Sequence, residues 1–180
     1  MIPLSDTYVG TKSRVVTVEL TSRLAMNYAA AVDDANPCYF VDDQAEPLPV
    51  PPMAATSLTW RLMRNLTDHW AVAGFPMEVL DRKVHFRETL IFHRPMYQDT
   101  TLSLQAEIAA IQPHTAGTEI TIRCTARDLA DCVFVEEATA LLRGVTCEGA
   151  GKARVDLGGG GRGGRRRLVG VGGRVGHKEG

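Results

Sequence analysis

One short segment of the chain, Asp33 to Phe40, gathers side chains that can do acid–base chemistry. Within it, Asp34, Asn36 and Tyr39 supply a carboxylate, an amide and a phenol. A carboxylate can hold a water molecule and take its proton, whereas tyrosine, with an ordinary pKa of about 10, is a poor base near neutral pH. Asp, Asn and Pro are also the residues that helix-ending turns prefer, through side-chain capping and the fixed φ of proline. The segment alone therefore favours a structural role.

The elements that must position this segment follow from the spacing of apolar residues. Alternation over residues 14–20 predicts a strand, and Thr21 can cap a helix that runs to Val32, just before the segment. A proline-rich linker then leads into a longer helix from Met53 to about Asp68. Its apolar face predicts packing against a sheet and consists of Ala54, Ala55, Leu58, Leu62, Met63 and Leu66.

The remainder of the chain, to about Val145, is typical of long antiparallel strands. Alternating apolar residues predict strands over residues 84–92, 102–110, 118–124 and 132–142, separated by turn signals. Two helices between a first strand and a run of later strands predict an α+β domain, with a helix packed on one face of the sheet.

Three segments resemble the MaoC-like hydratases and dehydratases, which add water to acyl thioesters or remove it. Residues 34–39, Asp-Ala-Asn-Pro-Cys-Tyr, are similar to the family's Asp-x-Asn-Pro-x-His loop. Residues 92–102 are similar to its strand ending in His-Arg-Pro-Leu and the following Gly-Asp-Thr-Leu turn. Pro51-Pro52-Met53-Ala54 resembles the helix start of its N-terminal, FAS1-like dehydratase domains. The resemblance implies a single hot-dog fold, a long central helix wrapped by an antiparallel sheet.

The resemblance also assigns positions in the site. It places Asp34 at the catalytic aspartate, Asn36 in the turn, and Tyr39 where the catalytic histidine stands in active members. Active members also carry a glycine near the helix start, whose N–H helps to hold the thioester oxygen; here only the amides of Met53 and Ala54 follow the two prolines. Relatives without the histidine resemble the noncatalytic halves of double hot-dog hydratases or of two-protein dehydratases.

The resemblance therefore implies a noncatalytic or substrate-binding half of a 3-hydroxyacyl/2-enoyl thioester hydratase-dehydratase. Its partners would be an acyl-CoA or acyl-carrier-protein thioester and a catalytic hot-dog protein, in a homodimer or a heterodimer. Two alternatives stay open. One is a self-sufficient hydratase in which Asp34 works with Tyr39 or His85, and the other is an acyl-binding dimer without catalysis. A hot-dog thioesterase is disfavoured, because it needs a carboxylate on the central helix and residues 53–67 contain none.

Two further residues have alternative interpretations. Trp60, with Met53 and Ala54, can be imagined to line an acyl pocket, but its type and setting favour core packing. The resemblance places His93 at a strand end, which favours a structural or interface role over a catalytic one.

Composition divides the chain into a body, residues 1–147, and a tail, residues 148–180. The tail holds 13 of the 17 glycines and eight Lys/Arg against three Asp/Glu, which leaves twelve against eighteen in the body, a formal charge of -6. The tail has little to bury, so we expect it to be disordered. RNA binding by its Arg/Gly runs is the weaker interpretation, because interleaved aromatic residues are missing; a shifted reading frame also explains the change in composition.

Several classes of function lack any signal in the sequence. There is no dinucleotide or phosphate-loop fingerprint, and the four cysteines have no metal-ligand spacing, so we expect no cofactor and no metal. The N-terminus lacks the features of a signal peptide, and no apolar run has the length of a membrane span. We therefore expect a cytoplasmic protein that neither enters a membrane nor binds nucleic acid.

Overall fold

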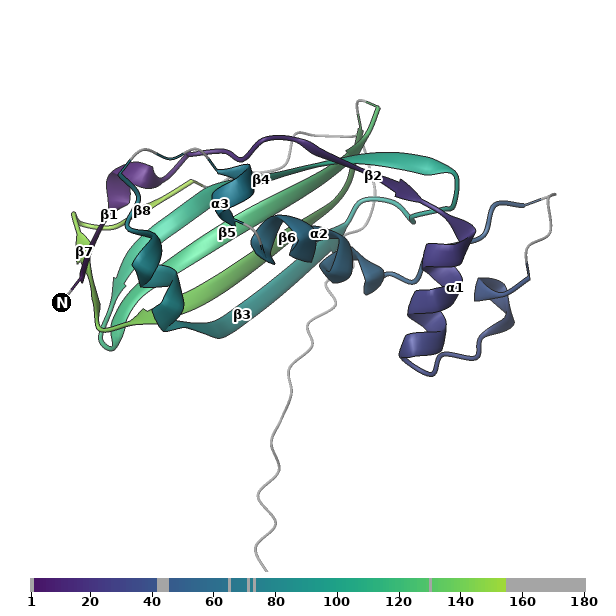
Figure 1. Ribbon diagram of the computed structural model, residues 1–180, viewed down its shortest axis with the longest axis horizontal. Helices are drawn as coiled ribbons and strands as arrows, with labels where there is room; N and C mark the ends of the chain where they lie inside the picture. Colours follow the sequence, from purple (N-terminus) through teal and green to yellow (C-terminus); the bar gives the residue numbers. More distant parts are fainter. Residues whose placement is uncertain are drawn as a thin grey trace, which may run out of the picture.

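The structure is a computed structural model that describes residues 2–41, 46–64, 66–70, 72, 74–129 and 131–154 (Figure 1). Its centre is an antiparallel sheet with the strand order β2-β4-β5-β6-β3, and β8 pairs with β4 outside this path. The strands of the path are β2 (Val16–Leu20), β3 (Lys83–Phe92), β4 (Thr100–His114), β5 (Gly117–Asp128) and β6 (Asp131–Arg143). The four predicted later strands are thereby confirmed.

The strand order follows from the lengths of the connections. Tight turns join β4 to β5 and β5 to β6, so these three strands pair as consecutive hairpins in the middle of the sheet. Gly117 lets the start of β5 approach the end of β6, since a Cβ there would lie 2.1 Å from the carbonyl oxygen of Leu142. The longer connection between β2 and β3 carries the helices, which leaves these two strands at opposite edges.

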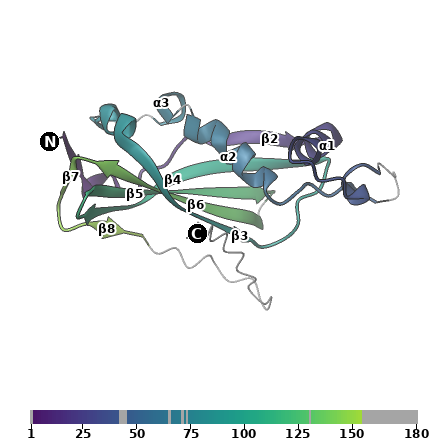
Figure 2. The same cartoon turned by 90° about the horizontal axis from the view of Figure 1, so that it is seen from below.

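Helices α2 (Ala54–Arg64) and α3 (Leu66–His69) lie on one face of the sheet, whereas α1 (Ser22–Ala31) lies beyond one end of it (Figure 2). Strand β8 (Lys152–Ala153) pairs with β4 as a member of the sheet. Helix α1 (Ser22–Ala31) is capped as predicted, because the Thr21 hydroxyl accepts a hydrogen bond from the Leu24 amide at 3.2 Å. The predicted helix from Met53 to Asp68 forms as two shorter helices, α2 (Ala54–Arg64) and α3 (Leu66–His69). Among the described residues, no helix has both the length and the apolar composition needed to cross a membrane.

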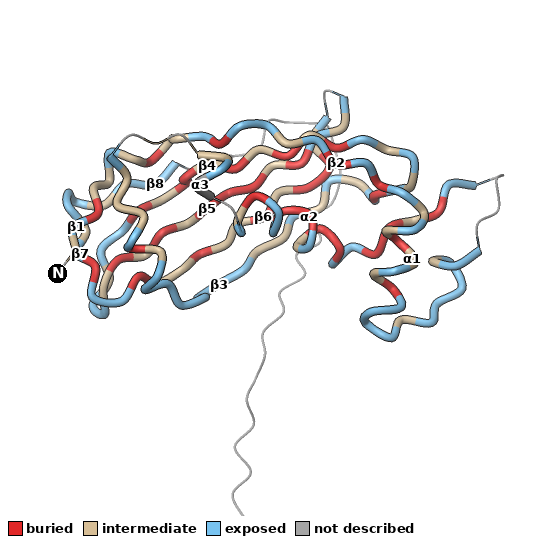
Figure 3. The backbone as a smooth tube through the Cα atoms, viewed as in Figure 1, coloured by how far each residue is buried: buried red, intermediate tan, exposed pale blue. Residues whose placement is uncertain are grey.

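The core lies between α2 and the sheet (Figure 3). Ala54, Leu58 and Leu62 form the predicted stripe and are fully or almost fully buried. They face apolar side chains of the central strands, where each buried leucine or phenylalanine contributes about 1.5–3 kcal/mol. The largest of these strand residues are Leu102, Leu104, Ile108, Ile111, Phe134 and Leu142. A helix packed on an antiparallel sheet is the α+β hot-dog arrangement that the sequence predicted.

Both ends of the described chain add strands that the sequence did not reveal. Strand β1 (Ile2–Ser5) pairs in parallel with β7 (Val145–Glu148), and three 3-10 helices complete the elements: η1 (Asp6–Tyr8), η2 (Pro37–Tyr39) and η3 (Met77–Arg82). Strand β8 pairs with β4, and Arg154 Nη1 lies 2.9 Å from Glu107 Oε1. Strands β7 and β8 thus extend past residue 147, where the sequence predicted the boundary between body and tail. The predicted disorder of residues 155–180 lies outside the described residues.

Candidate functional site

The candidate loop begins where α1 ends. Asp33 has a φ of 56°, in the left-handed region, and this turns the chain out of the helix. The Asp34 amide then bonds to the Ala29 carbonyl oxygen at 2.9 Å and closes the helix end. The loop lies at the end of the molecule where residues 98 and 99 hydrogen-bond to Leu48 and Leu20 (Figure 1).

Asp34 and Asn36 both use a side-chain oxygen to hold the loop. Asp34 Oδ1 accepts a hydrogen bond from the Asn36 amide at 3.1 Å, and Asn36 Oδ1 accepts one from the Cys38 amide at 3.2 Å. The second bond caps η2, whose first residue is Pro37. Asp34 is half-buried and Asn36 is exposed. Both residues therefore have the capping role typical of such turns, and their geometry alone does not require catalysis.

Tyr39 is a weaker acid here than an ordinary tyrosine and keeps its proton. It is half-buried at the end of η2, and burial raises its pKa, with smaller contributions in the same direction from Cys38 and Asp34. A phenol with a raised pKa keeps its proton near neutral pH, so Tyr39 can donate a hydrogen bond but does not replace a catalytic histidine.

The start of α2 offers fewer free amides than the sequence suggested. The Ala54 amide donates to the Pro51 carbonyl oxygen at 2.9 Å, and the Ala55 amide donates to that of Pro52 at 3.1 Å. Ala54 is fully buried, while Met53 is 45% exposed. Two amides were considered as donors to a thioester oxygen. The Ala54 amide is already hydrogen-bonded within the helix start, which leaves the Met53 amide as the candidate donor.

Trp60 does not pack in the core. Its side chain is 57% exposed on α2, so the core-packing interpretation is wrong for the chain alone. Thr59, the residue before it, supplies the buried position instead. Trp60 lies in the second half of α2, and its predicted role in lining an acyl pocket stays a prediction.

His85 lies near the beginning of β3 and His93 directly follows its end, so the two histidines lie apart and His85 lies far from the loop. Strand β3 begins at the end of the sheet opposite α1 and runs towards α1 (Figure 1). His85 is near its beginning, where Nε2 lies 3.6 Å from Glu88 Oε2. Asp34 and His85 therefore do not meet within one chain. His93 follows the last residue of β3, where its amide donates to the Val133 carbonyl oxygen at 2.9 Å, in agreement with a strand-end position.

A second acidic site, which we did not predict, lies beneath α2. Glu136 on β6 is 4% exposed and opposes Leu90 in the sheet, with Thr59 and Glu88 as hydrogen-bonding neighbours. Burial, followed by the hydrogen bond to Glu88, raises the pKa of Glu136 from 4.5 to about 8. The signal was present in the sequence, because Glu136 occupies an inward position in the alternation that buries Phe134 and Leu142.

Comparison with known families finds one family model that matches most of the chain. Residues 7–131 match the family model described as the FAS1-like, dehydratase domain region. The chain belongs to this family. A search of curated proteins found no match.

Solved structures with the same fold agree with membership in the FAS1-like dehydratase domain family. The C-terminally truncated HadBC (3R-hydroxyacyl-ACP dehydratase) complex from Mycobacterium tuberculosis matches with 16% identity and a TM-score of 0.62, over 74% of this chain and 96% of that one. A MaoC-like dehydratase from Phytophthora capsici matches with 16% identity and a TM-score of 0.62, over 81% of this chain and 50% of that one. The ChsH1-ChsH2 complex from M. tuberculosis matches with 18% identity and a TM-score of 0.55, over 76% and 99% of the two chains.

The shares of each matched chain that this FAS1-like dehydratase domain covers differ between the similar structures. The chain spans half of the Phytophthora protein but nearly the whole of the matched chains in the two M. tuberculosis complexes. At such low identities the likeness establishes the hot-dog fold and leaves the chemistry to the residues of this chain.

Proposed function

We propose that this protein is the substrate-binding half of an acyl-thioester hydratase-dehydratase and works beside a catalytic hot-dog partner. The observation that carries the proposal is the loop. By the family resemblance Tyr39 takes the position of the histidine; burial raises its pKa, and Oδ1 of Asp34 and Oδ1 of Asn36 each accept a hydrogen bond from an amide of the loop. Hydration of an enoyl thioester needs a base and an acid near neutral pH, and a partner would supply both.

The edge strand β3 supplies the surface for such a partner. It has ten residues and pairs with β6 on one side, and no other described strand pairs with its outer side. Its side chains include the exposed apolar residues Val84, Phe86 and Ile91, which are 48%, 51% and 36% exposed. A long, apolar and uncovered edge is a template for pairing with another strand. Two of the similar structures are described as complexes, which supports a hot-dog partner for this edge.

The orientation of the partner follows from symmetry. When equivalent edge strands of two similar domains pair around a two-fold axis, they run antiparallel. The beginning of β3 in this chain then lies beside the end of the partner's strand, which is the end where the partner carries its own loop after α1. This chain would thereby add surface to the partner's active site.

The test compares this protein alone with its complex. The purified chain should not hydrate crotonyl-CoA, whereas the chain co-expressed with the hot-dog protein of the adjacent reading frame should form a complex that does. Turnover by the chain alone, abolished by Asp34→Asn, would instead establish a self-sufficient hydratase. Thioester binding without turnover beside any hot-dog partner would establish an acyl-binding dimer.

A matched pair of variants tests the proposed edge. Ile91→Arg places a charge on β3 and should weaken the complex at least about tenfold, because an unpaired charge would be buried in the interface. Val15→Arg, at a residue 56% exposed before the opposite edge strand, is the control and should leave assembly unchanged. Equal assembly of both variants, measured by analytical ultracentrifugation, would place the partner elsewhere.

A further inference from the structure

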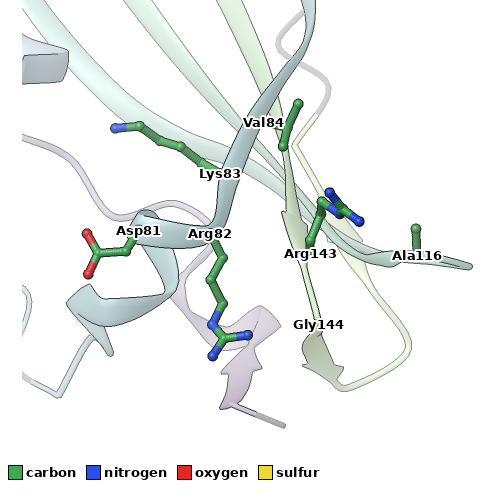
Figure 4. Close-up of a pocket in the computed structure, with 7 residues that line it drawn as sticks. All are labelled: Asp81, Arg82, Lys83, Val84, Ala116, Arg143 and Gly144. Atoms are coloured by element: carbon green, nitrogen blue, oxygen red, sulfur yellow. The ribbon is translucent and has the colours of Figure 1, made fainter.

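A basic pocket opens at the end of the sheet opposite α1. It has a volume of about 580 Å³ and lies between the end of η3, the start of β3 and the turns that follow β4 and β6 (Figure 4). This volume is within the range of small-molecule sites, about 300–1,000 Å³. Three of its lining residues are cationic: Arg82, Lys83 and Arg143.

Within the described part of the chain, these cations have no counter-charge at ion-pair distance. None of the three, Arg82, Lys83 and Arg143, forms an ion pair with another described residue. Asp81, the carboxylate that lines the pocket, extends away from the Arg82 guanidinium (Figure 4). Three of the twelve Lys/Arg of residues 1–147 therefore line one hollow, in a segment whose formal charge is negative. Such a local concentration of one sign in a concave surface attracts anions.

The arrangement of the cations suits several separated anionic groups. A Cβ on Gly144, which has a φ of 68°, would lie 3.4 Å from Arg82 Nη1, so this glycine leaves room for the guanidinium against the turn after β6. Arg82 and Arg143 extend in different directions beside this turn, and Lys83 extends to the other side of β3 (Figure 4). Cations that extend in different directions suit a ligand with several separated phosphates better than one inorganic phosphate.

We propose that this pocket binds the nucleotide end of coenzyme A, through its diphosphate and 3'-phosphate. An aromatic pair adjoins the pocket and offers a surface for the adenine: Phe86 is 51% exposed, and its ring lies 5.9 Å from that of His114. An acidic carrier protein brings one phosphodiester and a broad negative surface, which the negatively charged body repels. The pocket therefore selects a CoA thioester.

This inference rests on the proposed function, because it names the substrate of the paired site. In the antiparallel pairing of β3 with a partner strand, the start of β3 lies beside the partner's loop end. The pocket would hold the nucleotide while the pantetheine arm crosses towards the partner's catalytic residues. A cationic anchor far from the reacting carbons contributes binding that lowers KM more than it raises kcat.

Binding to the full chain, measured by calorimetry at low ionic strength, tests the pocket. CoA should bind more tightly than dephospho-CoA, and both more tightly than pantetheine. The double variant Arg82→Gln/Arg143→Gln should weaken CoA binding about tenfold or more and reduce its salt dependence. The variant Arg23→Gln/Arg64→Gln is the matched control, since it removes two exposed cations on α1 and α2 that do not line the pocket, and it should bind CoA as the parent does.

Two results would overturn the inference: unchanged CoA affinity in the pocket variant, or an equal loss of affinity in the control variant. The replaced side chains are exposed, so circular dichroism should show a folded protein; Lys83→Gln provides a second variant of the same pocket, expected to weaken CoA binding about threefold.

Kinetics of the complex separate this inference from the proposed function. If no partner yields hydration but CoA still binds and the pocket variant loses it, the proposed function fails and the pocket stands. If the complex hydrates crotonyl-CoA and crotonyl-pantetheine with equal KM, and the pocket variant leaves KM unchanged, the pocket fails and the function stands.

Discussion

The loop after α1 and the acidic site beneath α2 both present carboxylates, in opposite environments. Asp34 lies half-buried in a loop and accepts a hydrogen bond from a backbone amide two residues away. Glu136 lies 4% exposed between sheet and helix, with Glu88 beside it, and its pKa is raised to about 8. The loop has the sequence signature of a hydratase, while the acidic site has the perturbed chemistry.

This difference shows that a motif and a perturbed environment report different things. The loop motif is a local sequence signature: Asp34, Asn36 and Pro37 form its turn, and under the proposed function Tyr39 takes the place of the catalytic histidine. The raised pKa of Glu136 beside Glu88 reports the energetic cost of burying a charged carboxylate, because a carboxyl group away from water favours its protonated form. Perturbed acids gather at functional sites, but a core position beneath a helix also creates them. The predictions below separate these roles.

The largest effect should come from Glu136 and depend on pH. Because the folded state holds this proton up to about pH 8 and the unfolded state releases it near pH 4.5, the contribution to stability is full below pH 4.5 and is lost as pH rises through 8. We expect the free energy of unfolding to fall by about 2–4 kcal/mol between pH 5 and pH 8.5. Glu136→Gln, which mimics the protonated form, should remove most of this fall in urea titrations.

Three other titratable groups surround this site, so a control is needed. Glu88 on β3 and Cys124 on β5 face Glu136, and His85 lies 3.6 Å from Glu88. Glu137→Gln changes the neighbouring residue on the other face, where Glu137 Oε1 accepts a hydrogen bond from Arg123 Nε at 2.8 Å. This control should keep the pH dependence. If Glu136→Gln keeps it as well, the proton belongs to another member of the cluster.

An intermediate effect should follow from the cap in the loop. Asn36→Ala removes the oxygen that accepts from the Cys38 amide and should lower the free energy of unfolding by about 1 kcal/mol. Asn36→Asp keeps an acceptor in the same place and should stay within about 0.5 kcal/mol of the parent. Thermal denaturation of both variants measures the difference. Equal melting temperatures for Asn36→Ala and Asn36→Asp would mean that the cap contributes nothing.

Much of this fold could be predicted from sequence because local patterns determine it. Alternation gave β4, β5 and β6, and Thr21 gave the start of α1. What escaped prediction depends on contacts between distant segments. The pairing of β1 with β7 and of β8 with β4 joins short segments without periodicity, and the exposure of Trp60 depends on which face of α2 meets the sheet.

The candidate site was predictable to a similar degree and for the same reason. Asp34, Asn36 and Tyr39 lie close in sequence, so the structure brings them into one loop as expected. The occupied Ala54 amide depends on the turn at Pro51, and the Glu136 pair depends on the register of β3 against β6. Both depend on partners in three dimensions, which residue types alone do not specify.

A small effect should follow from restoring the family residue at position 39. Tyr39→His supplies a side chain with a suitable pKa, but Asp34 Oδ1 remains bonded to the Asn36 amide and the thioester donors at the start of α2 remain few. The variant chain alone should therefore stay inactive towards crotonyl-CoA, with a change in stability below about 1 kcal/mol, as is usual for one substitution at a half-buried position. Hydration by the variant without a partner would show that the histidine was the one missing part.

The smallest effect should come from Asp34→Asn, and it is the sharpest test of the loop. Asparagine keeps an oxygen that can accept from the Asn36 amide, so the turn should hold and stability should change by less than about 0.5 kcal/mol. If Asp34 only shapes the loop, kcat of the complex with its partner should also change less than about threefold. A general base typically raises the rate 10²–10⁴-fold. A fall in kcat of that size would therefore show that Asp34 acts in catalysis and does not only shape the loop. Because the substitution preserves the turn and removes only the charge, such a fall could be attributed to the lost carboxylate and not to unfolding of the loop.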